Sequence, residues 1–85
     1  MSGFSDPKAE EKVLRILSKI GKLSIKEITN ETKLEERRCL RAIAKLEASF
    51  MIEQYKFTEK FDITSLGKKH LSAVSKKEKQ LNYIK

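Results

Sequence analysis

The segment Ile25–Glu53, IKEITNETKLEERRCLRAIAKLEASFMIE, constrains the possible folds of this chain most strongly. Ser24 with Glu27, and Thr32 with Glu35, both fit the S/T-x-x-E box. In such a box a hydroxyl and a carboxylate satisfy the unpaired amides at the start of a helix. The segment therefore predicts a short helix, a tight turn, a longer basic helix and the start of a strand.

The remaining chain supplies elements on both sides of this pair of helices. Asp6 as a cap and Pro7 at the first helical position predict a helix over residues 7–20. The next two helices are expected at about 25–31 and from 33 or 34 to 49, and Leu23 fits a short strand. Residues 51–56 and 61–63 predict an antiparallel hairpin with its tip at 57–60. A final helix is expected from residue 64 or 65 to the end.

These elements predict an α+β fold that is mostly α: three helices and a β-hairpin, with an added C-terminal helix. We divide the chain into an arm (1–6), a helix and hairpin domain (7–64) and a C-terminal helix (65–85). Eighty-five residues, 39% of them hydrophobic, can form one domain with a small core.

Charge narrows the choice of partner. Nineteen Lys and Arg against twelve Asp and Glu give a formal net charge of +7. A positive charge of this density attracts polyanions and favours nucleic acid over an acidic protein or a membrane surface. The alternative is that the charge serves only solubility, because Lys-rich and Glu-rich surfaces also occur in thermophile proteins.

The third helix has two faces when its residues are placed about 100° apart. The predicted core face holds Cys39, Ala42, Ile43, Leu46 and Phe50. A basic stripe faces away from it. In a helix-turn-helix the second helix enters the major groove by its amino-terminal half. The predicted DNA contacts of the turn and this helix are Lys33, Glu36, Arg37, Arg38, Arg41 and Lys45, of which Lys45 is expected to meet the backbone.

The segment resembles the winged helix-turn-helix regulators of the MarR and ArsR type. The residues that carry the resemblance are Ile25, Ile28, Leu34, Cys39, Ile43, Leu46, Glu47, Met51 and Ile52, followed by Thr64 and Gly67 at the entry to the last helix. The likeness covers roughly residues 8 to 72. Lys33 departs from it where Gly or Asn commonly makes the turn. Glu35 and Glu36 also depart from it, and although they suit the helix dipole they repel phosphate.

The hairpin is the predicted wing. Lys56, Thr58 and Lys60 lie near its tip, and the resemblance implies that such tips touch the minor groove or its flanking phosphates. Tyr55 and Phe57 could stack on single-stranded bases, but packing within the hairpin is the favoured interpretation of both rings.

The last helix predicts a homodimer. Gly67, His70, Val74, Lys77, Leu81 and Ile84 follow the spacing of a heptad seam, and Leu71 broadens it. The expected dimer contacts are His70, Leu71, Val74, Lys77, Leu81 and Ile84. This part is similar in architecture to small archaeal winged-helix proteins that pair through a C-terminal coiled coil, which implies roles in chromatin or in viral and plasmid regulation. The alternative is a frayed basic tail after residue 76.

The sequence gives little support to an enzymatic function. The single histidine, His70, falls on the packing stripe, and the single cysteine, Cys39, falls on the core face. We expect no metal, no cofactor, no small-molecule ligand and no membrane span, and we expect a cytoplasmic non-enzyme. The predicted function is a homodimeric regulator of transcription that binds double-stranded DNA. The alternatives are an architectural DNA-binding protein with low specificity and a winged helix used for protein interaction.

Overall fold

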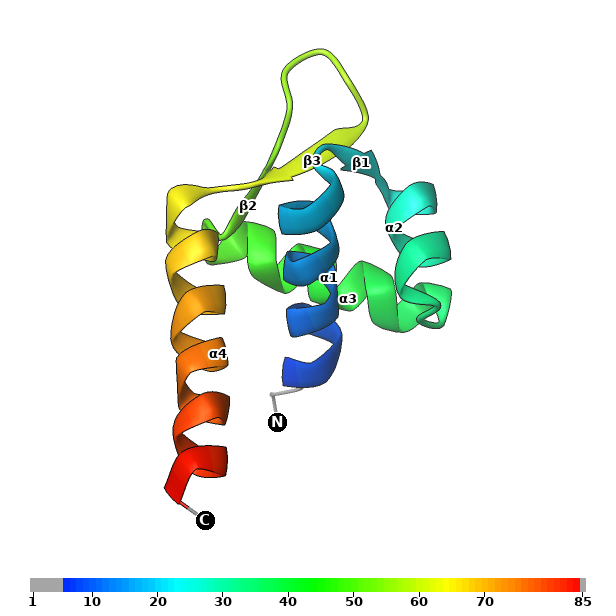
Figure 1. The fold of residues 1–85 in the computed structure, drawn as a ribbon. Coiled ribbons are helices and arrows are strands. Elements are labelled where there is room, and N and C mark those ends of the chain that lie inside the picture. The colour runs from blue at the N-terminus through cyan, green and yellow to red at the C-terminus, as the bar shows by residue number, and fades with distance from the viewer. Residues whose placement is uncertain (1–5, 85) are drawn as a thin grey trace.

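The computed structural model describes residues 6–84, with side chains described through residue 74. The elements are α1 (Pro7–Ile20), β1 (Leu23–Ser24), α2 (Ile25–Thr32), α3 (Glu36–Ala48), β2 (Ile52–Gln54), β3 (Lys60–Ile63) and α4 (Ser65–Ile84). Figure 1 shows α1 lying across α3, with α2 and α4 on either side of α1 and the β2–β3 hairpin at one end. The predicted order of helices and strands is confirmed.

The three strands form one small antiparallel sheet in the order β1-β3-β2. Leu23 of β1 pairs with Phe61 of β3, and Ile52 of β2 pairs with Ile63. These four side chains are all buried. The hairpin is therefore anchored to the helices at its base by apolar residues, while its tip extends away from them (Figure 1).

Two of the predicted helix starts are present. The carboxylate of Asp6 accepts a hydrogen bond from the amide of Ala9 at 3.3 Å, and Pro7 is the first residue of α1. At α2 the amide of Ser24 donates to the Glu27 carboxylate at 2.8 Å, and the amide of Glu27 donates to the Ser24 hydroxyl at 3.2 Å. The first predicted capping box is thus complete.

The second predicted box, Thr32 with Glu35, is wrong. Thr32 is the last residue of α2, and its buried hydroxyl donates to the carbonyl of Ile28 at 2.8 Å. The helix α3 begins at Glu36, two or three residues later than expected, and its N-cap Glu35 makes no side-chain capping bond. Lys33 ends α2 in a left-handed conformation with φ 59°, so the turn is made without the usual glycine.

One residue assigned to the core lies outside it. Phe50 was expected on the core face of the third helix, but α3 ends at Ala48 and Phe50 adopts a φ of 62°, which turns its ring outward. Its side chain is 76% exposed. Ile20, the last residue of α1, is 51% exposed.

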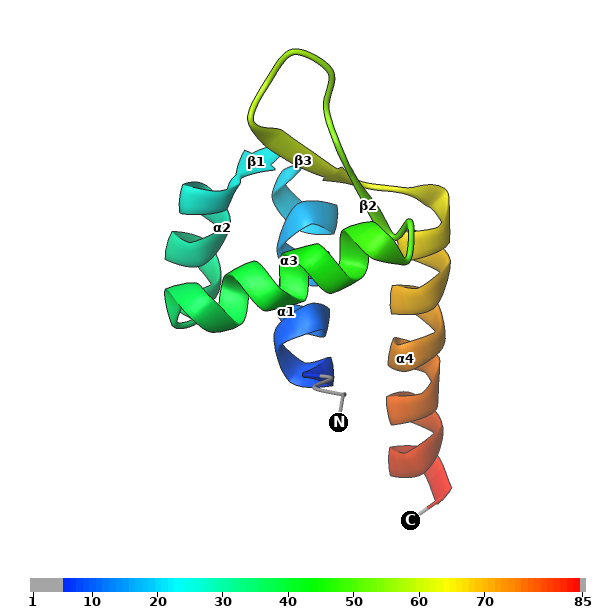
Figure 2. The same ribbon diagram turned by 180° about the vertical axis from the view of Figure 1, so that it is seen from behind.

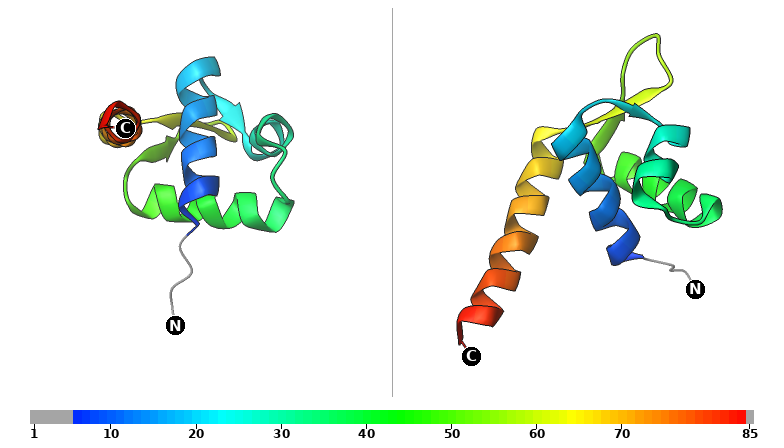
Figure 3. Two further views of the ribbon diagram at one scale, coloured as in Figure 1. Left: turned by 60° about the horizontal axis from the view of Figure 1, so that its bottom comes forward. Right: turned by 45° about the vertical axis from the view of Figure 1, so that its right-hand side comes forward.

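The core is a single cluster between α1, α2, α3 and the sheet. Figure 3 looks along α4 and shows α1 lying between α4 and α2, with α3 crossing beneath it. The buried apolar residues are Ala9, Val13, Leu14, Leu17, Leu23, Ile28, Leu34, Cys39, Ala42, Ile43, Leu46, Ile52, Phe61 and Ile63.

The last helix starts at a tight junction with the hairpin. The hydroxyl of Thr64 donates to the carbonyl of Phe50 at 2.6 Å and accepts from the amide of Gly67 at 3.1 Å. Gly67 is buried against Met51 and Ile63, and Leu71 packs against the core cluster one turn later. Beyond this point α4 runs past the start of α1 (Figures 1 and 2). Within the part of the chain that the structure describes, no helix combines the length and apolar character that crossing a bilayer requires.

Candidate nucleic-acid interface

The outer face of α3 is an open basic surface. Figure 2 shows α3 in front of α1, with the wing rising beyond it. Cys39, Ile43 and Leu46 are buried beneath the helix, while Arg37 and Arg41 on its opposite side are exposed. The two arginines are four positions apart, so they lie one above the other along the helix. Two guanidinium groups therefore project from the side of α3 that faces away from the core.

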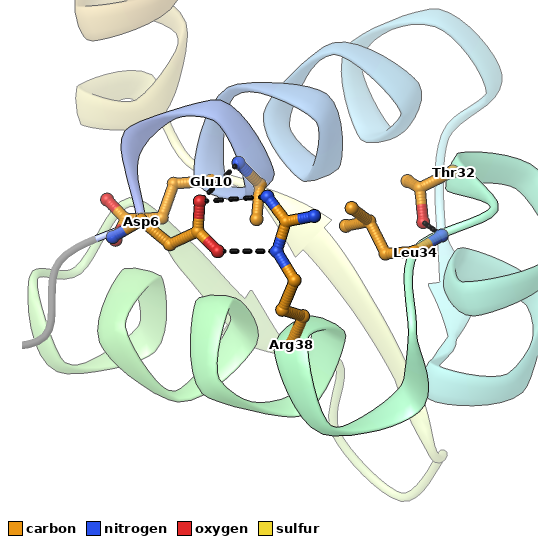
Figure 4. A network of polar contacts seen from close by, with 6 residues as sticks. Asp6, Glu10, Thr32, Leu34 and Arg38 are labelled. Carbon is orange, nitrogen blue, oxygen red and sulfur yellow. Dashed lines mark hydrogen bonds and ion pairs between the residues drawn. The ribbon is translucent and has the colours of Figure 1, made fainter.

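Arg38 belongs to a different face. Its Nε lies 2.6 Å from Oδ2 of Asp6, and its Nη2 lies 3.0 Å from Oδ1 (Figure 4). This hydrogen bond lowers the pKa of the Asp6 carboxyl and raises the pKa of Arg38. The predicted basic stripe thus divides: Arg38 joins the start of α3 to the cap of α1, and Arg37 and Arg41 lie on the outer face.

The side of α3 toward the wing carries an acidic residue, Glu36. Glu36 lines an open depression of about 700 Å³ together with Gln54, Glu59 and Phe61 of the hairpin and with residues of α2. Leu40 follows one helical turn after Glu36 and is 41% exposed. The same 100° projection that located the arginines places Leu40 beside Glu36, so this exposed leucine could have been found from sequence.

Lys33 and Lys45 mark the two ends of the outer surface. Lys33 is exposed at the turn between α2 and α3, where its left-handed backbone ends α2. Lys45 is exposed in the last turn of α3, where a positive charge suits the carbonyl end of the helix dipole. Both therefore have a structural role that is independent of any ligand.

The wing carries three of the predicted contact residues, and two of them also hold the hairpin. The hydroxyl of Thr58 donates to the carbonyl of Tyr55 at 3.0 Å and accepts from the amide of Lys60 at 3.1 Å. The ammonium of Lys60 lies 3.8 Å from the Glu27 carboxylate, which links the wing to α2. Lys56 is exposed at the tip.

Hydrogen bonding also affects Glu27 at this junction. The amide of Ser24 donates to its carboxylate and lowers its pKa, and the positive charge of Lys60 lowers it further. The ionised form of Glu27 is therefore the form that the capping box and the wing both favour.

The predicted dimer residues are only partly described. Leu71 packs on the core of its own chain, and His70 and Val74 line a cleft of about 300 Å³ between α1 and α4. The side chains of Lys77, Leu81 and Ile84 lie outside the described residues. The first half of the predicted seam therefore also lies against α1 of the same chain.

Cysteine, histidine and acidic side chains could supply other site chemistry. Cys39 is a free, buried thiol in the core. No group of three His, Cys, Asp or Glu side chains among residues 6–74 lies close enough together to hold a metal ion. The arrangement around α3 offers charged and apolar contacts to a large partner.

The architecture defines the class of fold. A three-helix unit in which α2 and α3 form a helix-turn-helix, followed by a β2–β3 hairpin closed by β1, is a winged helix-turn-helix. The fold class expected from the sequence is confirmed.

Comparison with solved structures agrees with this assignment. The Zalpha domain of PKZ from Carassius auratus, solved in complex with Z-DNA, superposes with a TM-score of 0.62 at 20% identity over 68% of this chain and 95% of that one. NadR without ligand gives a TM-score of 0.72 at 14% identity over 89% of this chain. NadR in complex with 4-hydroxyphenylacetate gives 0.76 at 16% identity over 96%. The match spans only 58% and 61% of the two NadR chains.

Comparisons based on the amino-acid sequence alone give no such match. No model of a known protein family matches the chain, and no characterised protein matches it at a significant level. At these identities the structural likeness establishes the fold, and the function has to be argued from the surface of α3 and the wing.

Proposed function

We propose that this protein binds double-stranded DNA, with α3 in the major groove, and regulates transcription. The observation that carries the proposal is the exposure of Arg37 and Arg41 on the face of α3 opposite the buried Cys39. An α-helix fits the major groove of B-DNA, and the arginine fork can meet guanine O6 and N7 or a phosphate.

The other predicted contacts have graded roles in this arrangement. Glu36 at the start of α3 is placed to accept from a cytosine amine, and exposed Leu40 is placed to meet a thymine methyl group. Lys33 and Lys45 supply charge at the two ends of the helix. Arg38 contributes mainly through its bond to Asp6, which fixes the position of α3. Lys56, Thr58 and Lys60 place the wing near phosphates.

The proposal includes a homodimer. The helix α4 is 20 residues long, about 30 Å at 1.5 Å per residue, and it runs beyond the start of α1 (Figure 1). A second copy of the chain that packs along this distal half would place two α3 helices on one duplex. Light scattering at micromolar concentration tests this: the mass of a dimer supports it, and the mass of a monomer contradicts it.

Two other functions use the same fold. An architectural protein would coat DNA through phosphate contacts with little sequence preference. A protein-interaction module would use the exposed apolar side chains instead, but it would not need two arginines on the outer face of α3. We favour the regulator because those arginines occupy the part of α3 that reaches base edges in a helix-turn-helix.

The test compares two double variants with the same charge. Arg37→Ala with Arg41→Ala removes two positive charges from α3, and Lys12→Ala with Lys19→Ala removes two from a depression along α1. If the arginines read bases, the first variant loses about 1 to 3 kcal/mol of binding free energy per lost contact, and the second loses less. Equal losses would mean that only net charge matters, and unchanged binding would move the site away from α3.

The DNA used in the test decides among the alternatives. Sites selected from random duplexes give the target sequence and the half-site spacing. Affinities for selected and random duplexes are then compared across a salt series, and equal affinities that fall together would favour the architectural role. A further duplex in the test is held in the left-handed form, because the Zalpha domain of PKZ was solved with Z-DNA. Circular dichroism reports the handedness of this duplex.

A further inference from the structure

Phe57 is presented to solvent in an unusual way. Its side chain is 100% exposed at the tip of the wing, whereas the other large exposed apolar side chains of the described residues range from 41% to 76%. Its φ is 60°, a left-handed conformation that a bulky residue adopts rarely. The tip therefore holds a large apolar ring away from the other side chains of residues 6–74, at a cost in backbone strain.

The tip keeps this shape through hydrogen bonds. The amide of Tyr55 donates to the carbonyl of Lys60 at 2.7 Å, and the amide of Thr58 donates to the carbonyl of Tyr55 at 3.1 Å. The side-chain amide of Gln54 also donates to the carbonyl of Thr58 at 3.1 Å. These hydrogen bonds close the loop on both sides of Phe57 and stabilise the conformation that presents its ring.

The neighbouring aromatic residue shows the contrast. The ring of Tyr55 lies under the ammonium of Lys22, 3.8 Å from its centroid, and is half exposed. Packing within the hairpin, the interpretation favoured for both rings, is found for neither: Tyr55 contacts Lys22, which precedes β1, and Phe57 is fully exposed. The ring of Phe57 thus has no stabilising partner within residues 6–74, and a rigid loop that presents such a ring is preorganised for an external one.

The positive charge of Lys56 at the tip favours a partner that carries negative groups. Lys56 and Thr58 are adjacent to Phe57, acidic Glu59 follows Thr58, and the ammonium of Lys60 lies 3.8 Å from the Glu27 carboxylate. A partner that fits a flat apolar ring with the positive charge of Lys56 beside it offers a stacked apolar slot next to a negative group. A base step of duplex DNA, with a phosphate on either side, has this composition.

We propose that Phe57 is a wedge that enters between two adjacent bases of the duplex from the minor groove. This inference rests on the proposed function: the tip projects away from the helices (Figure 3), and with α3 in the major groove it would face the neighbouring minor groove. Apolar side chains that insert in this way unstack one step and bend the duplex toward the major groove by roughly 20 to 90°. Lys56 then contacts a flanking phosphate.

The wedge predicts a preference for deformable DNA. Pyrimidine–purine steps such as TA unstack easily, and A-tracts resist unstacking. A TA step at the position of the wing should therefore bind more tightly than an A-tract at the same position, although neither base is read by hydrogen bonds. This preference should disappear when the ring is removed.

The experiment uses the whole chain and a selected duplex with 2-aminopurine at the wing position and a fluorophore pair at its ends. Wild-type protein should raise the 2-aminopurine fluorescence and shorten the end-to-end distance. Phe57→Ala should abolish both signals and lower the affinity about fivefold or more, in line with the loss of a base–aromatic contact. Phe57→Leu should retain part of both signals, because it keeps an apolar wedge.

Two controls separate the wedge from other effects. Phe50→Ala removes another exposed ring that also has a left-handed backbone, away from the tip, and should leave both signals unchanged. Phe57→Ala should keep the salt slope of the wild-type protein, whereas Lys56→Ala should reduce it by about one. The melting temperature of Phe57→Ala should match that of the wild-type protein, because the ring packs on nothing in the described fold.

The outcomes distinguish this inference from the proposed function. If Arg37→Ala with Arg41→Ala weakens binding while Phe57→Ala binds and bends DNA like the wild-type protein, the wedge is overturned and the helix contact stands. The exposed ring would then serve a protein partner. If the wild-type protein binds no duplex at all, both ideas fail together.

Discussion

Arg38 of α3 donates two hydrogen bonds, at 2.6 and 3.0 Å, to the carboxylate of Asp6, which lies 32 positions earlier in the chain (Figure 4). The same carboxylate caps α1 by accepting from the amide of Ala9. One side chain therefore both starts the first helix and fixes the beginning of the helix that carries the proposed DNA contacts. A substitution of Asp6 should consequently affect both the stability of α1 and the position of α3 at the candidate interface.

This double role can be separated by substitution. Asp6→Ser keeps an oxygen that can cap α1 and removes the bond to Arg38, whereas Asp6→Ala removes both. We expect thermal denaturation to show a larger loss for Asp6→Ala than for Asp6→Ser. In a double-mutant cycle, Arg38→Ala should add little to Asp6→Ser, because the pair is already broken. Fully additive losses would mean that the two residues act independently.

The pKa shifts of Asp6 and Glu27 predict how stability depends on pH. Both carboxyl pKa values are lowered in the folded protein, by the hydrogen bond from Arg38 and by the bond from the Ser24 amide respectively. The unfolded chain therefore binds protons more readily, and the stabilisation is present above about pH 4 and is lost as the pH falls through the folded pKa values. Urea unfolding between pH 7 and pH 3 measures this loss.

The matched control for this experiment replaces both carboxylates by amides. Asp6→Asn keeps an oxygen for the cap of α1, and Glu27→Gln keeps the capping box of α2. Neither amide titrates. The double variant should therefore show a flatter decline of the urea midpoint below about pH 4. A decline as steep as that of the wild-type protein would assign the acid sensitivity to other carboxylates.

Gly67 fixes the distance between α4 and the turn before β2. A methyl group at this position would lie 2.2 Å from the carbonyl oxygen of Met51 and 2.8 Å from Cγ1 of Ile63. Because the first of these atoms belongs to the backbone, Gly67→Ala should lower the free energy of unfolding by roughly 1 to 3 kcal/mol. Chemical denaturation measures it, and Ser72→Ala, at an exposed position of α4, should stay within about 0.5 kcal/mol of the wild-type value.

The capping box of α2 should stabilise the helix-turn-helix. Ser24→Ala removes the hydroxyl that accepts from the amide of Glu27 at 3.2 Å. The expected loss is about 1 kcal/mol in the free energy of unfolding. Ser18→Ala, on the exposed side of α1, provides a control in which no cap is lost. Equal values for the two variants would show that the box adds nothing to stability.

Local sequence signals located most of the elements because their causes are local. Asp6 with Pro7 starts α1, and Ser24 with Glu27 starts α2, through bonds between residues at most three positions apart. The Thr32 box failed for a related reason. Its hydroxyl can donate to the preceding carbonyl of Ile28 instead, and the burial of Leu34 and Thr32 favours that choice.

The sequence by itself determined the order of the elements, the buried face of α3 and the exposure of Arg37 and Arg41, because apolar periodicity and helix starts are properties of neighbouring residues. Only the tertiary structure decided that Arg38 joins Asp6, that Phe50 turns outward and that Phe57 projects alone from the wing. These positions depend on where a helix ends and on what lies beside it in space. A projection of residues around one helix axis shows neither the end of the helix nor its neighbours in space.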